Sequence, residues 1–359
     1  MNTVSDFKNT FTTLLNNAQT TLIEDFSFLT LPCNQKPWLN TAIKINQGDS
    51  FSSFAIGHTE LIGTSIQFNA SFQLWFRISL TGDIFRGTRD SHSFIADNAG
   101  DLYVASYFPA EWTTKTGDIA IADEAYQLVS GEFEILLIRW QTNPLTGLLT
   151  LFKQSENNPL IALEIERLQT TNNLPKEWSY LWFLGPAEIY QYQHNDKPIM
   201  CCHTHKDCGL LQKDIDLSFK EQTYLHWSWK IEQLPSAVRE DTLATHDYLS
   251  IAVEFDNGQD ITYYWSAELE PETAYRCPIP SWHDRETHVV IRSGMENLGE
   301  WFDEQRDIYA DYQRVIGGVM PNKIVRIWLI AVSLFQQNQG DCQYAGIRFL
   351  SDNIVTEIL

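Results

Sequence analysis

Two basic side chains in the second half of the chain, His226 and Lys230, have the types and spacing that acid–base chemistry requires. Side chains at even spacing on a strand share a face, so these two residues lie together on one face of a predicted strand. The opposite face is apolar and consists of Leu225, Trp227, Trp229 and Ile231. Because histidine exchanges its proton near neutral pH, His226 is the predicted acid or base.

Neighbouring strands are expected to extend this polar face. The predicted catalytic residues are His226, Lys230, Tyr248, Glu254 and Tyr264. The predicted ligand-binding residues are Arg292, Arg348, Trp178 and Trp182. Aromatic and cationic side chains of this kind can stack on a ring and donate hydrogen bonds to oxygen atoms. The two tryptophans begin the second predicted domain, where they line a cleft between domains or belong to its core. For the whole face, the alternative is a solvated sheet surface without a ligand.

The segment Cys201–Cys208 carries the densest group of cysteine and histidine. Cys201, His203 and His205 share one face of an extended strand, and thiolates and imidazoles are zinc ligands. The segment lacks a Cys-x-x-Cys pair, and no second ligand pair follows at the usual distance. We therefore predict no metal site, with buried structural cysteines as the leading interpretation, and zinc or a reactive thiol as the alternatives.

Several classes of function are disfavoured by the composition. The net charge of −21 disfavours nucleic acid and anionic membrane surfaces as partners. A phosphate loop, a dinucleotide-binding glycine fingerprint and a nucleophile elbow are all missing, so no cofactor is predicted. The start of the chain has no signal-peptide pattern, and no window reaches membrane-spanning length, so we expect a cytoplasmic location with mostly reduced cysteines.

The elements that must position these residues are mainly strands. The 12 Trp, 14 Tyr and 20 Phe suit pleated sheets, and short alternating segments separated by turns predict an all-β protein of two jelly-roll-like β-sandwiches. We predict a helix over residues 1–25, a first sandwich over 26–171 and a second over 172–359. The linker is expected at Asn172–Lys176, and one helix, at about Gly299–Val315, is inserted in the second sandwich.

The first sandwich resembles the galactophilic bacterial lectins. The resemblance rests on the segments Trp38–Asp49, Phe54–Gly57, Trp75–Ile78 and Asp97–Tyr103. It implies a small jelly roll, and in that family calcium holds the sugar. The segment Tyr107–Gly117 lacks the acidic and amide cluster that supplies calcium ligands in these lectins, so neither calcium nor galactose is expected here.

The second half resembles a bacterial domain family of unknown function. The residues that carry this resemblance are His226–Pro235, His246–Tyr248, Tyr263–Trp265, Arg292–Gly294 and Glu304–Tyr312. It implies a galactose-binding-like β-sandwich. The family tends to have an arginine at the position of Ile251 and an Asp-Thr-Asp-like run at Ser333–Asn338. Activities that depend on those groups are therefore not expected of this chain.

The leading hypothesis for function is binding of a small organic or sugar-like ligand, on the polar face of the second sandwich or in the interdomain cleft. The alternative is a cofactor-free enzyme on the same scaffold, such as a cyclase, lyase or hydrolase of a biosynthetic pathway, which acts by acid–base or positional catalysis. A structural protein whose aromatic residues form only core and interface is the third class. The oligomeric state stays open.

Overall fold

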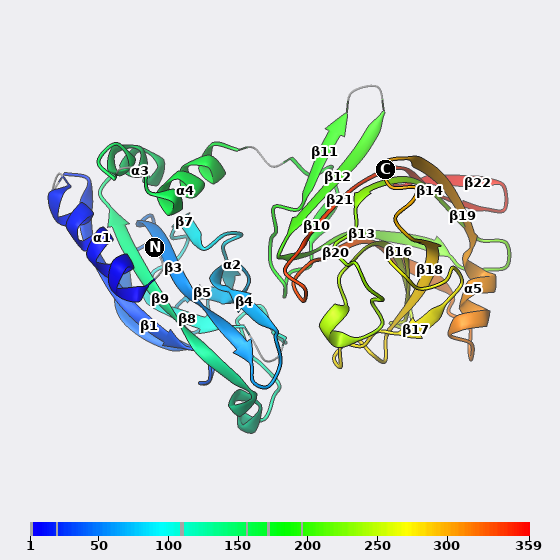
Figure 1. Ribbon diagram of the computed structural model, residues 1–359, viewed down its shortest axis with the longest axis horizontal. Coiled ribbons are helices and arrows are strands. Elements are labelled where there is room, and N and C mark those ends of the chain that lie inside the picture. Colours follow the sequence, from blue (N-terminus) through cyan, green and yellow to red (C-terminus); the bar gives the residue numbers. More distant parts are fainter. Residues whose placement is uncertain (1–2, 19–20, 108–110, 156, 171–172, 195–196) are drawn as a thin grey trace. The chain divides into compact units, whose positions relative to one another are not determined.

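The computed structural model describes residues 3–18, 21–107, 111–155, 157–170, 173–194 and 197–359 (Figure 1). The chain divides into two units, Met1–Thr171 and Asn172–Leu359, each with its own sheets and core. The first residue of the predicted linker and residues 108–110 of the segment Tyr107–Gly117 lie outside the described residues. Within the described residues, none of the helices is long and apolar enough to cross a membrane.

The first unit is a β-sandwich. Its five-stranded sheet contains β1 (Ile23–Pro32), β9 (Val129–Trp140), β3 (Ser50–Leu61) and β4 (Gln67–Asn69), with β7 (Ser91–Ile95) also paired to β3. Its four-stranded sheet contains β2 (Leu39–Ile45), β8 (Gly100–Ser106), β5 (Leu74–Ile78) and β6 (Phe85–Arg86). Apolar side chains from both sheets, including Phe51, Phe76 and Ile135, form the core between them.

Helices cover the other face of the five-stranded sheet. They are α1 (Val4–Asn17), α3 (Pro144–Phe152) and α4 (Pro159–Gln169), and the unit also has the short α2 (Ala70–Gln73) and η1 (Asp123–Leu128). Phe7 and Phe11 of α1 are fully buried in the second core of the unit, and Phe11 packs on Phe54 of β3. The predicted N-terminal helix therefore exists, but it ends at Asn17 and is followed by β1.

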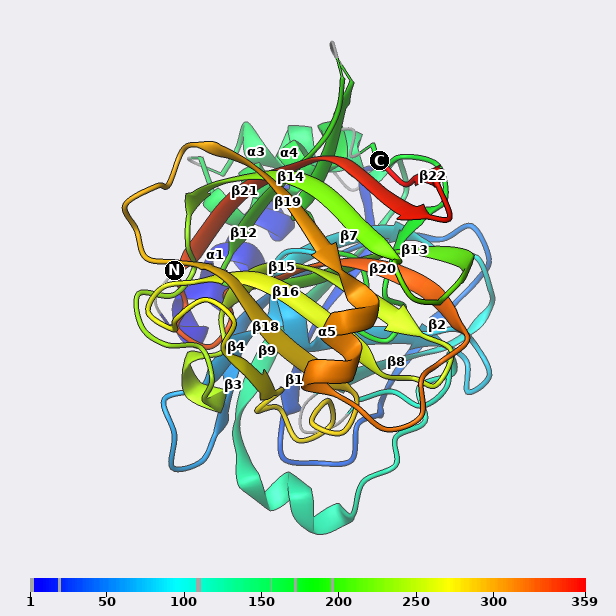
Figure 2. The same ribbon diagram turned by 90° about the vertical axis from the view of Figure 1, so that its right-hand side faces the viewer.

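The second unit is a larger β-sandwich (Figure 2). The seven-stranded sheet has the order β10 (Trp178–Tyr180), β13 (Cys208–Ser218), β20 (Lys323–Val332), β15 (Tyr248–Phe255), β16 (Asp260–Ser266), β18 (Glu286–Ser293) and β17 (Ala274–Arg276). The six-stranded sheet has the order β11 (Tyr190–His194), β12 (Pro198–His205), β21 (Gln339–Ser351), β14 (Tyr224–Gln233) and β19 (Trp301–Asp307), with β22 (Ile354–Glu357) also paired to β21. The unit also contains η2 (Leu243–Thr245) and α5 (Ile308–Val315).

Alternation along β14 builds the core of this sandwich. Its predicted apolar face is confirmed, because Leu225, Trp227, Trp229 and Ile231 are all at most 1% exposed. The Trp227 ring stacks on Tyr263 of the facing sheet, with ring centroids 5.8 Å apart. The two sheets therefore meet through their large aromatic side chains, and the polar side chains of β14 point away from this core.

The helix predicted at Gly299–Val315 is shorter than expected. Its first part is the strand β19, which pairs antiparallel with β14 from Trp301 to Asp307. The helix α5 begins after this strand, and the Asp307 side chain caps it by accepting a hydrogen bond from the backbone N–H of Ala310 at 3.1 Å. Pairing with a neighbouring strand, which local sequence does not encode, therefore prevailed over helix formation here.

Candidate functional sites in the second unit

The predicted polar face is divided between two opposite surfaces of the second sandwich. His226, Lys230 and Arg348 lie on the outer face of the six-stranded sheet, where His226 pairs with Arg348 across β14 and β21. Tyr248 and Tyr264 lie on the outer face of the seven-stranded sheet. The expectation that neighbouring strands extend the polar face of His226 and Lys230 to Tyr248 and Tyr264 is therefore wrong. The physical reason is that β14 and β15, although consecutive in the chain, belong to different sheets.

The remaining predicted residues have separate surroundings. Glu254 accepts a hydrogen bond from Arg326 at 2.7 Å, and the guanidinium of Arg292 lies 3.7 Å from the centroid of the Phe302 ring and binds Glu304. Trp178 is 6% exposed and belongs to the core of the second unit, whereas Trp182 is 37% exposed. Glu254 and Arg292 thus form ion pairs inside the unit instead of joining the polar face.

A row of side chains crosses the outer face of the six-stranded sheet. One residue comes from each of five neighbouring strands, in direct register: Gln191, Cys201, Gln343, Lys230 and Trp301. Gln191 and Trp301 are exposed at the two ends, and the other three are half-buried. In the next row, the Ser228 hydroxyl donates to Asp303 at 2.5 Å. We call this surface, from Gln191 to Trp301 and including Ser228 and Asp303, the outer polar row.

His226 lies beside the outer polar row. Partial burial and the nearby positive charge of Arg348 lower the pKa of the His226 imidazole. Its Nε2 atom is buried and has no hydrogen-bond partner among the described residues. Since a lowered pKa favours the neutral ring at neutral pH, His226 can accept a proton or a hydrogen bond from a ligand.

The Cys201–Cys208 segment does not converge on one point. His203 Nδ1 lies 3.5 Å from a carboxylate oxygen of Asp341, and His205 Nδ1 lies 2.6 Å from the Gln339 amide nitrogen. Burial raises the pKa of the Cys201 thiol, which disfavours a reactive thiolate. Cys201, His203 and His205 do share one face of β12, but side chains two residues apart on a strand are about 6.6 Å apart. The partners found for His203 and His205 lie on β21.

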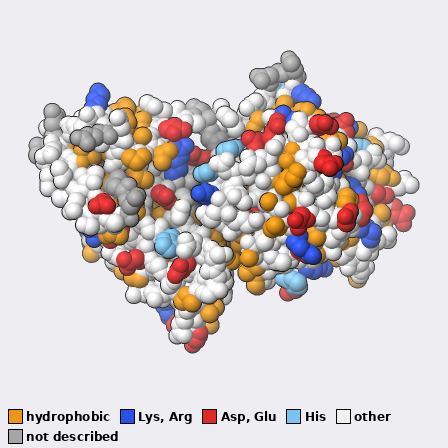
Figure 3. Space-filling model, in the orientation of Figure 1, with side chains coloured by type: hydrophobic (Ala, Val, Ile, Leu, Met, Phe, Trp, Pro, Cys, Tyr) orange, Lys and Arg blue, Asp and Glu red, His pale blue; other side chains and the backbone are white. Residues whose placement is uncertain are grey.

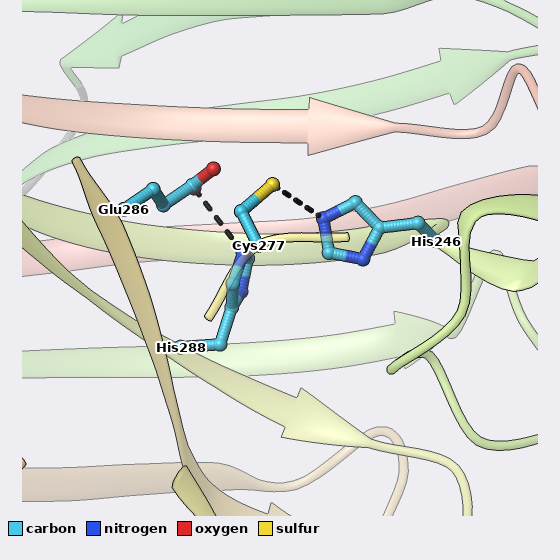
Figure 4. A group of neighbouring side chains, drawn as sticks. All are labelled: His246, Cys277, Glu286 and His288. Atoms are coloured by element: carbon cyan, nitrogen blue, oxygen red, sulfur yellow. Dashed lines mark hydrogen bonds and ion pairs between the residues drawn. The ribbon is translucent and has the colours of Figure 1, made fainter. Parts of the chain in front are cut away.

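A different group of ionisable side chains converges on the outer side of the seven-stranded sheet (Figure 4). His246 precedes β15, Cys277 follows β17, and Glu286 and His288 lie on β18. All four are buried, and their ligand atoms lie within 4.8 Å of one another. We call this group the buried cluster. Within the described part of the chain, the buried cluster is the group of side chains whose geometry suits a metal ion.

Surrounding polar groups orient the members of the buried cluster. Tyr248 and Thr262 donate hydrogen bonds to Glu286 Oε1 at 3.2 and 3.1 Å. Burial lowers the pKa of His246 to about 3, with the neighbouring His288 as a second cause. Burial also raises the pKa of the Cys277 thiol, and the Glu286 carboxylate adds to that increase. Without a bound cation, the buried cluster thus holds a neutral imidazole and a protonated thiol.

Sequence reasoning missed the buried cluster. Tyr248 was predicted as a site residue, but its partner Glu286 was not, and none of the four members was chosen. The signal that was available is the alternation of Glu286 and His288 on β18, which puts both side chains on one face of a strand. His246 and Cys277 come from connecting segments, so only tertiary structure brings them to that face.

A comparison with protein families finds one match, which lies in the second half of the chain. Residues 176–348 match the family described as "Protein of unknown function (DUF3047)". The expected resemblance of the second half to a family of unknown function is therefore confirmed over these residues. No curated protein matches the chain.

Three solved structures are similar to parts of this chain at low identity. The EclA N-terminal domain, a PllA-like lectin, is 12% identical with a TM-score of 0.26, over 34% of this chain and 99% of its own. The xyloglucanase domain of NopAA from Sinorhizobium fredii is 9% identical with a TM-score of 0.29, over 52% and 95%. A family 30 carbohydrate-binding module from Clostridium thermocellum is 10% identical with a TM-score of 0.28, over 51% and 96%. These similarities concern the fold alone.

Proposed function

We propose that the second sandwich binds a small polyhydroxylated, sugar-like ligand on the outer polar row. The observation that carries the proposal is the direct register, across five strands, of Gln191, Cys201, Gln343, Lys230 and Trp301. The two primary amides can donate to and accept from hydroxyl groups, and the ammonium group of Lys230 can donate to them. An exposed indole can pack on the apolar face of a sugar ring. The row therefore combines the two kinds of contact that such a ligand requires.

The charges around the outer polar row also suit a neutral ligand. Lys230 pairs with Glu232, and the Lys197 ammonium lies 5.2 Å from the centroid of the Trp301 ring. Asp303 is engaged by Ser228, so both signs of charge are present and partly compensated. On the face of the molecule seen in Figure 3, acidic and basic side chains are interspersed. A hydroxyl-rich molecule can replace water at such groups without bringing a charge of its own.

Catalysis on the same surface is the alternative. His226 supports it, because its ring is favoured in the neutral form and its Nε2 atom lacks a partner among the described residues. The buried and ion-paired surroundings of Tyr248, Tyr264 and Glu254 argue against their joining His226 as acid–base partners. We therefore favour binding over turnover, and the two differ in whether an incubated ligand is recovered unchanged.

Replacing Trp301 by alanine is expected to reduce ligand affinity at least tenfold while the melting temperature changes little, because the indole is 39% exposed. The measurement is binding of the full chain to an array of oligosaccharides, followed by calorimetric titration with the best ligand. Trp182→Ala is the matched control, since Trp182 is 37% exposed but lies outside the row. Equal affinity of wild type and Trp301→Ala, or loss of binding in Trp182→Ala alone, contradicts the proposal.

A further inference from the structure

We propose that His246, Cys277, Glu286 and His288 form a closed, four-ligand zinc site in the second sandwich. The four side chains point toward one another from three separate segments of the chain (Figure 4). The site lies on the other side of the sandwich from the outer polar row, so this inference does not depend on the proposed ligand.

The distances within the buried cluster suit tetrahedral zinc. Cys277 Sγ lies 3.4 Å from His246 Nε2, and Glu286 Oε1 lies 3.4 Å from His288 Nε2. Bonds of about 2.0–2.3 Å at tetrahedral angles put two zinc ligands about 3.3–3.7 Å apart. Both pairs therefore already have the separation of neighbouring corners of a zinc tetrahedron.

The His288 imidazole supplies the clearest sign of a missing partner. Both of its ring nitrogens are buried and make no hydrogen bond among the described residues, and the side chain is 0% exposed. The carboxylate oxygen Oε1 of Glu286 lies 3.4 Å from Nε2, beyond the distance of a good hydrogen bond. A buried polar group normally has a partner, because leaving it unpaired costs free energy. The His288 ring is held in place by stacking on Tyr275, with centroids 5.1 Å apart and an interplanar angle of 10°. A metal bond to Nε2 would give this rigid ring a partner.

The orientation of His246 is the one that a metal ligand requires. Its Nδ1 atom lies 2.7 Å from the backbone carbonyl oxygen of Glu240. A carbonyl oxygen only accepts hydrogen bonds, so Nδ1 carries the proton and the lone pair is on Nε2. That atom faces the Cys277 sulfur. A hydrogen bond from the second ring nitrogen to a carbonyl group is a common means of orienting a zinc-binding histidine.

The backbone segments that carry His246 and Cys277 are anchored. The Asp247 carboxylate accepts hydrogen bonds from the backbone N–H groups of Phe335 and Gln336, at 3.0 and 2.7 Å. The Cys277 carbonyl lies 2.9 Å from Nδ1 of His283, and its N–H donates to the Glu286 carbonyl at 3.0 Å. The ligands are therefore positioned before a metal ion binds, which lowers the entropic cost of forming the site.

Charge compensation favours a dication in the buried cluster. The Glu286 side chain is 3% exposed, and the basic side chain found within 4 Å of its carboxylate among the described residues is the His288 imidazole, at 3.4 Å, and not a lysine or arginine. Binding Zn²⁺ forms a bond to sulfur and releases the Cys277 thiol proton to solvent, with no change of oxidation state. The thiolate, the carboxylate and Zn²⁺ then sum to zero charge, which removes the cost of burying an uncompensated ion.

Elemental analysis of the purified full-length chain tests the proposal. We expect one zinc per chain in the wild type and in Cys201→Ser, which alters a cysteine of the other Cys–His segment. We expect none in Cys277→Ser. Wild-type protein that is metal-free, and whose melting temperature does not rise when zinc is present during refolding, overturns the proposal, as does a stoichiometric metal other than zinc.

Cobalt substitution keeps the test decisive if Cys277→Ser does not fold. Wild-type protein refolded with Co²⁺ is expected to show a sulfur-to-cobalt charge-transfer band and the intense visible bands of tetrahedral cobalt. The isosteric variant Glu286→Gln keeps an oxygen acceptor for Tyr248 and Thr262 but loses the charge. It is expected to bind cobalt at least tenfold more weakly. Six-coordinate cobalt spectra without a sulfur band, or unchanged cobalt affinity in Glu286→Gln, overturn the proposal.

Discussion

Replacing Trp229 by alanine is expected to lower the free energy of unfolding of the second unit by about 3–5 kcal/mol. The indole is 0% exposed, packs against Trp227 and Trp265, and donates from Nε1 to Glu304 Oε1 at 3.1 Å. Alanine leaves a cavity between the two sheets, and the aromatic contacts are lost. Since domains are stable by about 5–15 kcal/mol, this single change removes a large part of the stability.

Denaturant titration followed by circular dichroism measures this effect. Trp301→Ala is the matched control, because it truncates a tryptophan on the neighbouring strand β19 that is 39% exposed. We expect the denaturant concentration at the unfolding midpoint to fall strongly for Trp229→Ala and only a little for Trp301→Ala. Similar midpoints for the two variants would show that the core between the sheets does not depend on this aromatic contact.

Replacing Asp311 by asparagine is expected to lower the free energy of unfolding by about 3 kcal/mol at neutral pH. The Asp311 carboxylate is buried and accepts hydrogen bonds from Arg306 at 2.7 and 2.9 Å, from Arg314 at 2.9 Å and from the Tyr263 hydroxyl at 3.0 Å. Asparagine keeps the shape but removes the charge. The two guanidinium groups then lose the buried carboxylate on α5 and keep the more exposed Glu272 carboxylate as their shared partner.

The same carboxylate gives this variant a characteristic pH dependence. Burial alone would raise the pKa of Asp311, but the hydrogen bonds and charge of Arg306 and Arg314 outweigh burial and lower it from its usual 3.8. A carboxyl with a lowered pKa stabilises the folded state above its unfolded pKa, and this contribution is lost as the pH falls through the folded pKa. The difference in the free energy of unfolding between wild type and Asp311→Asn should therefore be largest at neutral pH and become smaller below about pH 4.

Urea unfolding at neutral pH and at about pH 3 measures the Asp311 effect. Asp284→Asn, which removes an exposed carboxylate of the same unit, is the control and should leave stability nearly unchanged at both pH values. If Asp311→Asn loses the same amount of stability at both pH values, the shape of the side chain, and not its charge, accounts for the effect.

Local sequence determined much of the architecture. Alternation at Leu225–Ile231 correctly separated buried from outward-facing residues, because the side-chain period of a strand depends on the backbone alone. The all-β fold with two sandwiches followed from the same pattern, repeated over many short segments, and from the abundance of aromatic residues. The prediction of a helix at Gly299–Val315 was only partly correct, because Trp301–Asp307 forms a strand that pairs with β14.

Tertiary structure alone decided which polar residues meet. A period of two assigns a residue to a face of its strand but does not say to which sheet the strand belongs. Tyr248 and His226 therefore looked like neighbours although they lie on opposite sides of the sandwich. Likewise, His246 and Cys277 reach the side chains of β18 from connecting segments with no regular spacing, and their convergence depends on contacts between residues 31 positions apart in the chain.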